Sequence, residues 1–292
     1  MKPLISILTP TCPSRHPFLF HLLQLILRQQ QISFSQVEWI ILDNYHEHVH
    51  DIRYQLNKYA PLFYNLIYWY VVDASTTVGG KRNIMKQQAH GSFIIHMDDD
   101  DYYGPFFLNT LYRIYCNYHS TYSVFGSSVM YYLHPQHPFL LKTGPFSKNH
   151  TCANIMAYTK EYARTHHFNH QSPWGEERSF LDHFRQPVFQ IPHIYRVFLP
   201  VIHDSNTFDK KKIQLQTTSL YAYFHLSSFS VPFYVQLYPS HLPFILAIHA
   251  RNKGCHRFIC TASLKLIIST FTFLAFHTFE LICKIQRVLI KQ

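Results

Sequence analysis

Short apolar runs recur along the first third of the chain, each followed by a polar turn. They lie at residues 4–8, 38–42, 66–72 and 93–97. Short apolar runs bounded by turn-forming residues are typical of buried strands. Because helical patterns separate these runs, the sequence predicts an α/β fold with a mostly parallel, Rossmann-like sheet flanked by helices.

Helix signals lie between these runs. Pro17 suits the first position of a helix that continues to Gln31. A second helix is predicted at about residues 81–89, after Gly79-Gly80, and a third follows Pro105.

The pattern changes in the middle of the chain. Residues 124–133 and 153–159 are expected to form strands. Residues 174–185 are expected to form a helix, with Ser172 as its cap and Pro173 at its first position.

A boundary is expected near residue 210, where the composition changes. Residues 1–210 carry 17 Lys and Arg against 15 Asp and Glu, whereas residues 211–292 carry nine basic residues and one acid, Glu280. The excess positive charge therefore belongs to the tail. The near-neutral main part argues against nucleic acid as a partner.

The tail, residues 211–292, is expected to be a mainly helical appendage that is apolar and basic. Its stretch 266–285 is close to the length of a membrane span. His277 and Glu280 interrupt this stretch, and an acid at the middle of a span costs several kcal/mol. Basic flanks also fit an interfacial helix on anionic lipid. A span, peripheral membrane contact and a helix packed on the main domain all stay open.

Cysteine usage indicates the compartment. Six cysteines are scattered without a CxxC pair, which indicates reduced thiols rather than a disulfide framework. No signal peptide precedes the first strand. We expect a cytoplasmic protein, membrane-associated if the tail contacts lipid.

Four consecutive aspartates, Asp98 to Asp101, directly follow the fourth apolar run. Two carboxylates ~4 Å apart repel each other by about 4 kcal/mol at an effective dielectric constant of ~20. A bound divalent cation removes this cost, and open α/β sheets bind ligands at the carboxyl ends of their strands. Asp43 and Asp73 end two further predicted strands. The pattern predicts a metal site, and the alternative is a solvated acidic turn or an acidic helix N-terminus.

Five elements occur in a fixed order along the chain. They are a strand ending in Thr9-Pro10-Thr11, a strand ending in Asp43, Gly80-Lys81-Arg82-Asn83, a strand before Asp98-x-Asp100-Asp101-Tyr102, and Trp174-Gly175-Glu176-Glu177. In this order the chain resembles the family 2 glycosyltransferases over roughly residues 3–208. The resemblance implies a GT-A fold for a catalytic domain at residues 1–210. It also implies transfer of a sugar from a nucleotide-sugar donor, a UDP-sugar, to a hydroxyl of a glycan, protein or lipid acceptor, with inversion.

The resemblance further implies roles for individual residues. The expected nucleotide-sugar site comprises Thr9, Asp43, Arg82, Asn83, Asp98 and Trp174. Asp98, Asp100 and a later histidine, which falls on His203, are expected to bind the metal. Hard oxygen ligands suit Mg²⁺ or Mn²⁺, and a histidine in the set favours Mn²⁺. The catalytic pair falls on Glu176 and Glu177, with Glu177 as the base toward the acceptor hydroxyl.

The chain departs from the family pattern at two points. The usual Glu-Asp pair is Glu176-Glu177 here, so the expected base is one methylene longer, and which of the two is the base stays open. Four consecutive aspartates also allow two Asp-x-Asp registers, of which we prefer Asp98 and Asp100 because the apolar run ends at Met97.

Structural roles are the alternatives for several of these residues. The two glutamates also suit the first turn of a helix, Trp174 fills either a sugar site or the core, and His203 is either a ligand or a structural histidine. His46, His48 and His50 are expected to lie in a solvated loop or at a helix start, because the chain has 22 histidines.

Two other functions stay open: a carboxylate-metal nucleotidyltransferase, and a non-catalytic protein that binds nucleotide, sugar or membrane.

Overall fold

The computed structural model describes residues 3–73, 75–133, 140–172, 174–203 and 206. The predicted boundary near residue 210 and the apolar stretch 266–285 lie outside these residues. Within the part of the chain so described, every helix is too short or too polar to cross a bilayer.

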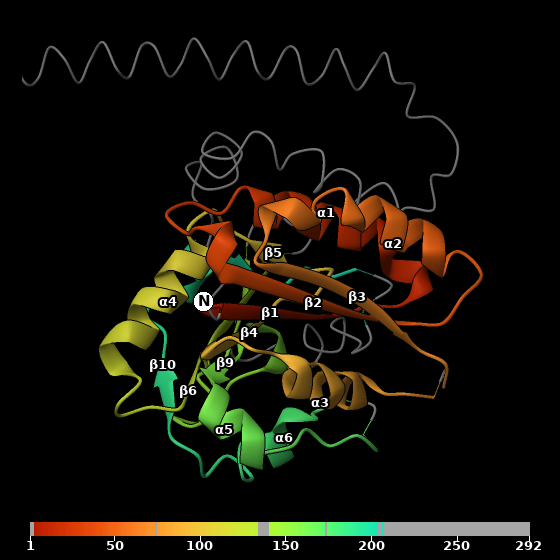
Figure 1. Ribbon diagram of the computed structural model, residues 1–292. Coiled ribbons are helices and arrows are strands. Elements are labelled where there is room, and N and C mark those ends of the chain that lie inside the picture. Colours follow the sequence, from red (N-terminus) through yellow and green to blue (C-terminus); the bar gives the residue numbers. More distant parts are fainter. Residues whose placement is uncertain (1–2, 74, 134–139, 173, 204–205, 207–292) are drawn as a thin grey trace, which may run out of the picture. The chain divides into compact units, whose positions relative to one another are not determined.

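A seven-stranded sheet forms the centre of this part of the chain (Figure 1). Four of its strands, β1 (Ile5–Pro10), β2 (Val37–Asn44), β3 (Asn65–Val71) and β4 (Phe93–His96), are parallel and lie in the order β4-β1-β2-β3. The four apolar runs of the sequence are these strands, so the predicted mostly parallel sheet is confirmed.

The other half of the sheet contains one reversed strand. β9 (Ala157–Thr159) is antiparallel to both β4 and β6 (Val124–Gly126), and β10 (Val188–Gln190) is parallel to β6 at the edge. Two small sheets accompany it. β5 (Tyr102–Tyr103) pairs with β11 (Phe198–Leu199), and β7 (Met130–Leu133) pairs with β8 (Leu140–Thr143).

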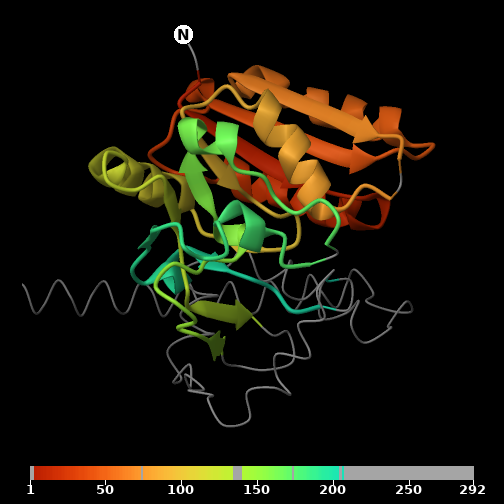
Figure 2. The same ribbon diagram turned by 90° about the horizontal axis from the view of Figure 1, so that it is seen from below.

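Helices cover both faces of the parallel strands. α1 (His16–Leu27) and α2 (Val49–Asn57) lie on one face, and α3 (Val78–Gln88) lies on the other (Figures 1 and 2). The other helices are α4 (Phe107–Tyr118), α5 (Lys160–Thr165) and α6 (Glu177–Phe180). Short 3-10 helices lie at Pro13–Arg15, Phe34–Gln36, Ala60–Leu62, Ala153–Ile155 and Ile194–Arg196. The helices predicted after Pro17, Gly80 and Pro105 are thus confirmed as α1, α3 and α4.

The prediction of a single strand at 124–133 was wrong. The backbone leaves the main sheet at Ser127 and Ser128, where side-chain oxygens, and not a neighbouring strand, accept the hydrogen bonds of its amides. The Ser127 amide donates to Thr151 Oγ1 at 3.1 Å and the Ser128 amide donates to Gln190 Oε1 at 2.6 Å. The strand expected at 153–159 is likewise shorter, since a 3-10 turn precedes β9.

The prediction of a helix at 174–185 was also wrong, since only α6 is helical there. Gly175 has φ +69°, and residues 182–184 have φ values of +46° to +62°. Left-handed conformations end an α-helix, so the backbone turns at both sides of α6. The predicted capping residue Ser172 instead donates its hydroxyl to Trp174 O.

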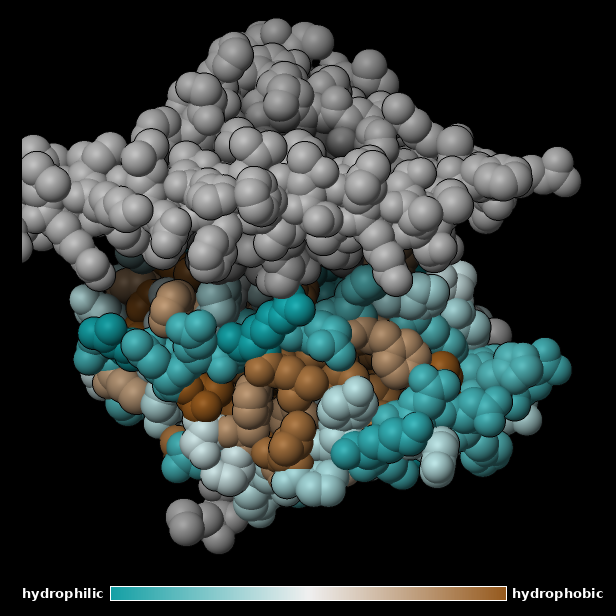
Figure 3. Space-filling view, turned by 90° about the horizontal axis from the view of Figure 1, so that it is seen from above, coloured by the Kyte–Doolittle hydropathy of each residue, from teal (hydrophilic) through white to brown (hydrophobic). Residues whose placement is uncertain are grey.

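One hydrophobic core packs beneath α3, α5 and α6, and it supports the segments that contain the candidate site residues. Its members on the sheet include Leu8, Ile40 and Ile94, and Phe168 and Phe180 stack with ring centroids 4.1 Å apart. The face of the molecule in Figure 3 shows apolar side chains lying between hydrophilic ones on the described surface. Burial of the core fixes α3 against the segment that contains α6.

Replacing Gly79 with Ala is expected to destabilise this packing. A Cβ at Gly79 would lie 2.2 Å from Asn169 O and 3.0 Å from Glu176 Cβ, so the segment must move away from α3. We expect the free energy of unfolding to fall by about 1–3 kcal/mol. Urea denaturation measures this loss.

Gly80→Ala is the matched control in the same helix. Its Cβ would meet the Thr76 methyl group at 3.2 Å, and Ala is the better helix former. We expect a change below ~1 kcal/mol. Equal losses for the two variants would contradict a specific contact at Gly79.

Candidate functional site at the carboxyl edge of the sheet

The carboxyl ends of β1, β2 and β4 meet at one edge of the sheet. The Thr11 amide donates to Leu42 O at 3.0 Å, and the Met97 amide donates to Leu8 O at 3.1 Å. The residues at and after these strand ends therefore lie at one edge of the sheet, and they include Asp43 and the acidic quartet Asp98 to Asp101. This is the edge where parallel α/β sheets bind ligands.

Three of the four consecutive aspartates are shielded from solvent, whereas the alternative interpretation was a solvated acidic turn. Asp99, Asp100 and Asp101 are all buried. Asp101 accepts from Asn154 Nδ2 at 2.6 Å and from the Val201 amide at 3.0 Å, so both of its oxygens bind protein groups. Asp101 therefore stabilises the loop structure around the site.

Arg15 supplies positive charge to the quartet. Its guanidinium contacts Asp99 Oδ1 and Asp100 Oδ2, both at 2.5 Å. Burial opposes the charged guanidinium, but Asp100 and Asp99 outweigh burial and raise the pKa of Arg15. Burial, together with the charge of Asp100, raises the pKa of Asp99 although Arg15 opposes this effect. Thr11 Oγ1 also donates to Asp99, at 2.6 Å.

Asp98 has a different environment from the other three. Arg82 donates from Nη2 to Asp98 Oδ2 at 3.0 Å, whereas Asp98 Oδ1 is buried and has no hydrogen-bond partner among the described residues. The same guanidinium donates from Nε to Glu176 Oε1 at 3.1 Å and contacts His96 Nδ1. Burial lowers the pKa of Arg82, but Asp98 and Glu176 outweigh it and the pKa is raised. Arg82 thus links the acidic quartet to the predicted catalytic pair.

His203 lies beside Asp100. Its Nε2 is 2.9 Å from Asp100 Oδ2, and its ring stacks on Phe18 with centroids 4.8 Å apart. Asn206 donates from Nδ2 to the same Asp100 oxygen at 2.9 Å. The predicted ligands Asp100 and His203 are therefore brought together.

Two of the predicted ligands at this edge, Asp100 and His203, offer a carboxylate and an imidazole, which are donors that divalent cations accept. Asp98 has a buried oxygen with no hydrogen-bond partner among the described residues. Asp98 does not cluster with the other two, however: among the described residues, the ligand atoms that lie within 4.8 Å of one another belong to His16, Asp43 and His46. Arg15 provides the positive charge at the quartet in this structure.

Asp43 is fully buried at the end of β2. Its Oδ2 lies 2.7 Å from His16 Nε2 and accepts from Tyr68 at 2.5 Å, and its Oδ1 accepts from the Asn44 amide at 2.7 Å. Burial raises its pKa, but the bonds from His16 and Tyr68 outweigh burial and hold the pKa below its ordinary value. Asp43 is therefore an ionised carboxylate.

Asp73 does not join this edge site. It is exposed, and its carboxylate accepts from the amide and hydroxyl of Ser75. Of the three strand-ending aspartates, Asp43 and Asp98 lie at the carboxyl edge of the sheet with different partners, and Asp73 stands apart from them.

Thr9 and Asn83 serve the fold. The Thr9 hydroxyl donates to Met97 O at 2.8 Å and accepts from Trp39 Nε1 at 3.0 Å, so it is engaged within the sheet. Asn83 pairs with the backbone of Phe168 through both amide atoms, at 2.8 and 2.9 Å. This pairing fastens α3 to the segment that leads to Trp174.

Lys81 is a buried cation between the first two strands. It donates to Thr11 O at 2.5 Å and to Asn44 Oδ1 at 2.6 Å. Burial lowers its pKa, opposed in part by Asp43 and Asp99. Lys81 therefore holds the two loops together at the sheet edge.

The Glu176-Glu177 pair separates into two environments. Glu176 is buried and bonded to Arg82, whereas Glu177 is half-buried and lines a pocket of about 590 Å³. Burial, and secondarily the charge of Glu176, raise the pKa of Glu177 to about 7. Trp174 is 63% exposed and lines the same pocket, so it does not fill the core.

The structure is similar to solved nucleotide-sugar enzymes. S. aureus TarS 1–349 in complex with UDP-GlcNAc matches with a TM-score of 0.53 and 16% identity, over 70% of this chain and 60% of that one. The mannosyltransferase PcManGT from Pyrobaculum calidifontis, in complex with GDP-Man and Mn²⁺, matches with a TM-score of 0.54 and 12% identity, over 96% of this chain and 83% of that one. The chain thus spans less than two thirds of the TarS structure. No family model and no curated protein matches the sequence.

The chain has a GT-A fold. Identities this low show the fold alone, and the predicted fold class is confirmed.

Several residues of this candidate site were not singled out from the sequence. Arg15, His16 and Thr11 follow β1, and Tyr68 lies on β3. A basic residue in the loop after the first parallel strand could have been matched to the acidic quartet, because both reach the same edge. His46 was expected in solvent with His48 and His50, but only the latter two are exposed, and His46 contacts Asp43.

Arg82→Ala is expected to destabilise the protein strongly. It leaves the carboxylates of Asp98 and Glu176 without their shared cation in a buried place. Removing one partner of a buried ion pair costs about 3–5 kcal/mol. Arg178→Ala, at an exposed position of α6, is the control, with an expected change within about 0.5 kcal/mol. Similar unfolding free energies for both variants, measured in urea, would refute this role of Arg82.

Proposed function

We propose that this protein is a metal-dependent glycosyltransferase that moves a sugar from a nucleotide-sugar donor to an acceptor hydroxyl, with inversion. One observation carries the proposal. The Arg82 guanidinium bonds Asp98 on one side and Glu176 on the other, and so places the acidic quartet beside the Glu176-Glu177 pair. A donor site and a base are needed side by side for direct transfer to a hydroxyl.

The donor binds at the carboxyl edge in this proposal. Asp43 accepts from the base or ribose, and Asp98, Asp100 and His203 hold Mn²⁺ or Mg²⁺. When bound, the cation offsets the negative charge that grows on the departing diphosphate. Arg82 keeps Asp98 oriented, and Asn83 and Thr9 keep the walls of the site in place.

Glu177 is the proposed general base. Its raised pKa suits a group that takes a proton near neutral pH, and it lines the pocket that would receive the acceptor. Trp174 offers an exposed ring on which a sugar can stack. Glu176, tied to Arg82, is a positioning residue.

The structural neighbours guide the choice of donor for the first assays. TarS is in complex with UDP-GlcNAc, and PcManGT is in complex with GDP-Man and Mn²⁺. For this chain we propose a UDP-sugar with Mn²⁺, transferred to a hydroxyl of a glycan, protein or lipid. GDP-mannose is the comparison donor.

Asp100→Ala and Glu177→Gln are expected to abolish most turnover, for different reasons. Glu177→Gln keeps the shape of the side chain but accepts no proton, so the rate falls by about 10²–10⁴ while nucleotide affinity stays. Asp100→Ala weakens metal-dependent nucleotide binding as well. Release of UDP or GDP measures turnover, and calorimetry measures binding.

Exposed acids provide the matched controls. Asp73→Ala removes an aspartate after a neighbouring strand, and Glu161→Gln removes a glutamate on α5, and both should retain full turnover. Equal turnover in wild type, Asp100→Ala and Glu177→Gln would refute the proposed enzymatic activity. Nucleotide affinity that ignores the metal would favour a non-catalytic binding protein, and nucleotidyl transfer in place of sugar transfer would identify the other alternative.

Turnover is expected to depend on pH through Glu177. A base with a pKa of about 7 is protonated below that pH, so kcat/KM should rise about tenfold per pH unit below 7 and level off above it. A flat profile across pH 5–8 in the wild type would contradict the assignment of Glu177 as base.

Ionisation of Glu177, which should raise turnover, should lower the stability of the protein. The pKa of Glu177 is higher in the folded than in the unfolded state, so folding favours the protonated carboxyl group. The free energy of unfolding therefore falls as pH rises from about 4.5 to about 7. Glu177→Gln should therefore be more stable than wild type at pH 8 and equal to it at pH 4, by urea denaturation.

A further inference from the structure

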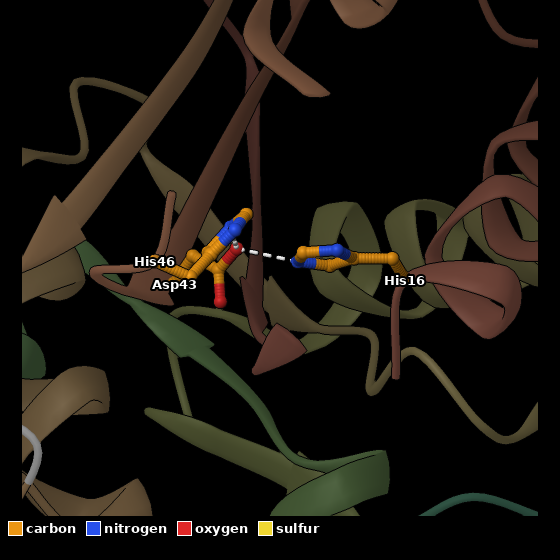
Figure 4. A group of neighbouring side chains, drawn as sticks. All are labelled: His16, Asp43 and His46. Atoms are coloured by element: carbon orange, nitrogen blue, oxygen red, sulfur yellow. Dashed lines mark hydrogen bonds and ion pairs between the residues drawn. The ribbon is translucent and has the colours of Figure 1, made fainter. Parts of the chain in front are cut away.

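Two histidines from different parts of the chain face the Asp43 carboxylate (Figure 4). His16 begins α1 and His46 follows β2, and both rings point toward Asp43. Their Nε2 atoms lie 2.7 Å and 3.3 Å from Asp43 Oδ2. The two ring centroids are 4.7 Å apart.

The three side chains offer a cation-binding geometry. One ligand atom from each lies within 4.8 Å of the others. In a tetrahedral zinc site, ligands about 2.0–2.2 Å from the metal lie roughly 3.3 Å from one another. Small side-chain rotations at His16 and His46 would therefore bring all three atoms into one coordination sphere. Asp43 is fully buried, and the two histidines are 12–13% exposed, so the site is sheltered but reachable.

The carboxylate is crowded at the point where the histidines meet. Besides the two rings, Tyr68 donates to the same Oδ2 at 2.5 Å, which fixes the orientation of the carboxylate. An outer hydrogen bond of this kind orients a ligating carboxylate in metal sites. One phenol and two imidazoles thus converge on a single oxygen atom of the Asp43 carboxylate.

The charge and ligand type select the class of cation. Lys81 places a buried ammonium near Asp43, so a cation that depends on charge alone is poorly held there. Two imidazoles and one carboxylate suit Zn²⁺ and related transition metals, whereas Mg²⁺ prefers an oxygen shell. The cluster therefore differs in chemistry from the aspartate site next to it.

We propose that His16, Asp43 and His46 form a second cation site, specific for Zn²⁺-class transition metals and separate from the Asp98–Asp100 site. The histidines bind through Nε2 as neutral imidazoles, and a water completes the four-coordinate shell.

The site also predicts regulation, a step that rests on the proposed function. Asp43 is the carboxylate expected to contact the nucleotide, so a metal that occupies it withdraws it from the donor. Zn²⁺ at this site then weakens nucleotide binding without displacing Mn²⁺ from the aspartates.

Cobalt(II) tests the site without any need for activity. The full chain is titrated with Co²⁺, whose visible absorption is intense in tetrahedral sites and weak in octahedral oxygen sites. Wild type and Asp100→Ala should both give the intense band, and Zn²⁺ should remove it. His16→Ala and His46→Ala should weaken Co²⁺ binding by roughly tenfold or more.

His48→Ala is the matched control, because His48 lies two residues from His46 with an exposed side chain. It should leave the band unchanged. Circular dichroism shows whether each variant is folded. If His16→Ala does not fold, His46→Ala, in the loop after β2, provides the test by itself. A wild type without the intense band, or a band that survives both His16→Ala and His46→Ala, would overturn the site.

A second arm separates the two proposals. Nucleotide affinity is measured with saturating Mn²⁺, with and without Zn²⁺, in wild type and His46→Ala. Zn²⁺ should weaken binding in wild type only, and equal weakening in both would overturn the regulation. Nucleotide that fails to bind under any condition would contradict the proposed function while the cobalt result still decides the metal site.

Discussion

One buried guanidinium determines how the site is assembled. Arg82 comes from α3, on one face of the sheet, and bonds Asp98 after β4 and Glu176 before α6. The two acids are far apart in sequence, and each would be an uncompensated charge without it. Packing of α3 against the core fixes where the guanidinium lies, so the core sets the geometry of the site.

Four neighbouring aspartates acquire different roles because their partners differ. The carboxylate of Asp101 accepts from loop groups, and that of Asp99 contacts Thr11 and Arg15. Asp100 contacts Arg15, His203 and the side-chain amide of Asn206, whereas Asp98 is bonded by Arg82. Identical side chains are distinguished by which strand or loop faces each of them.

The parallel half of the fold was predictable from the sequence, because buried strands are short apolar runs with clear ends. The region of residues 174–185 was not, because its turns use left-handed backbone at Gly175 and 182–184, which a helical pattern of side chains does not reveal. The candidate aspartates and glutamates could be found as motifs. Arg15 belongs to no motif, and its pairing with the quartet follows only from the strand order, which brings the loop after β1 to the same edge of the sheet.

The reversed strand β9 has a consequence for biogenesis. β4, β1, β2 and β3 come from the first part of the chain and can pair as soon as they leave the ribosome. β6 has no neighbour on the inner side until β9 is synthesised and inserted between it and β4. The nascent chain therefore carries a sheet edge at β4, with unpaired backbone N–H and C=O groups, until β9 pairs with it.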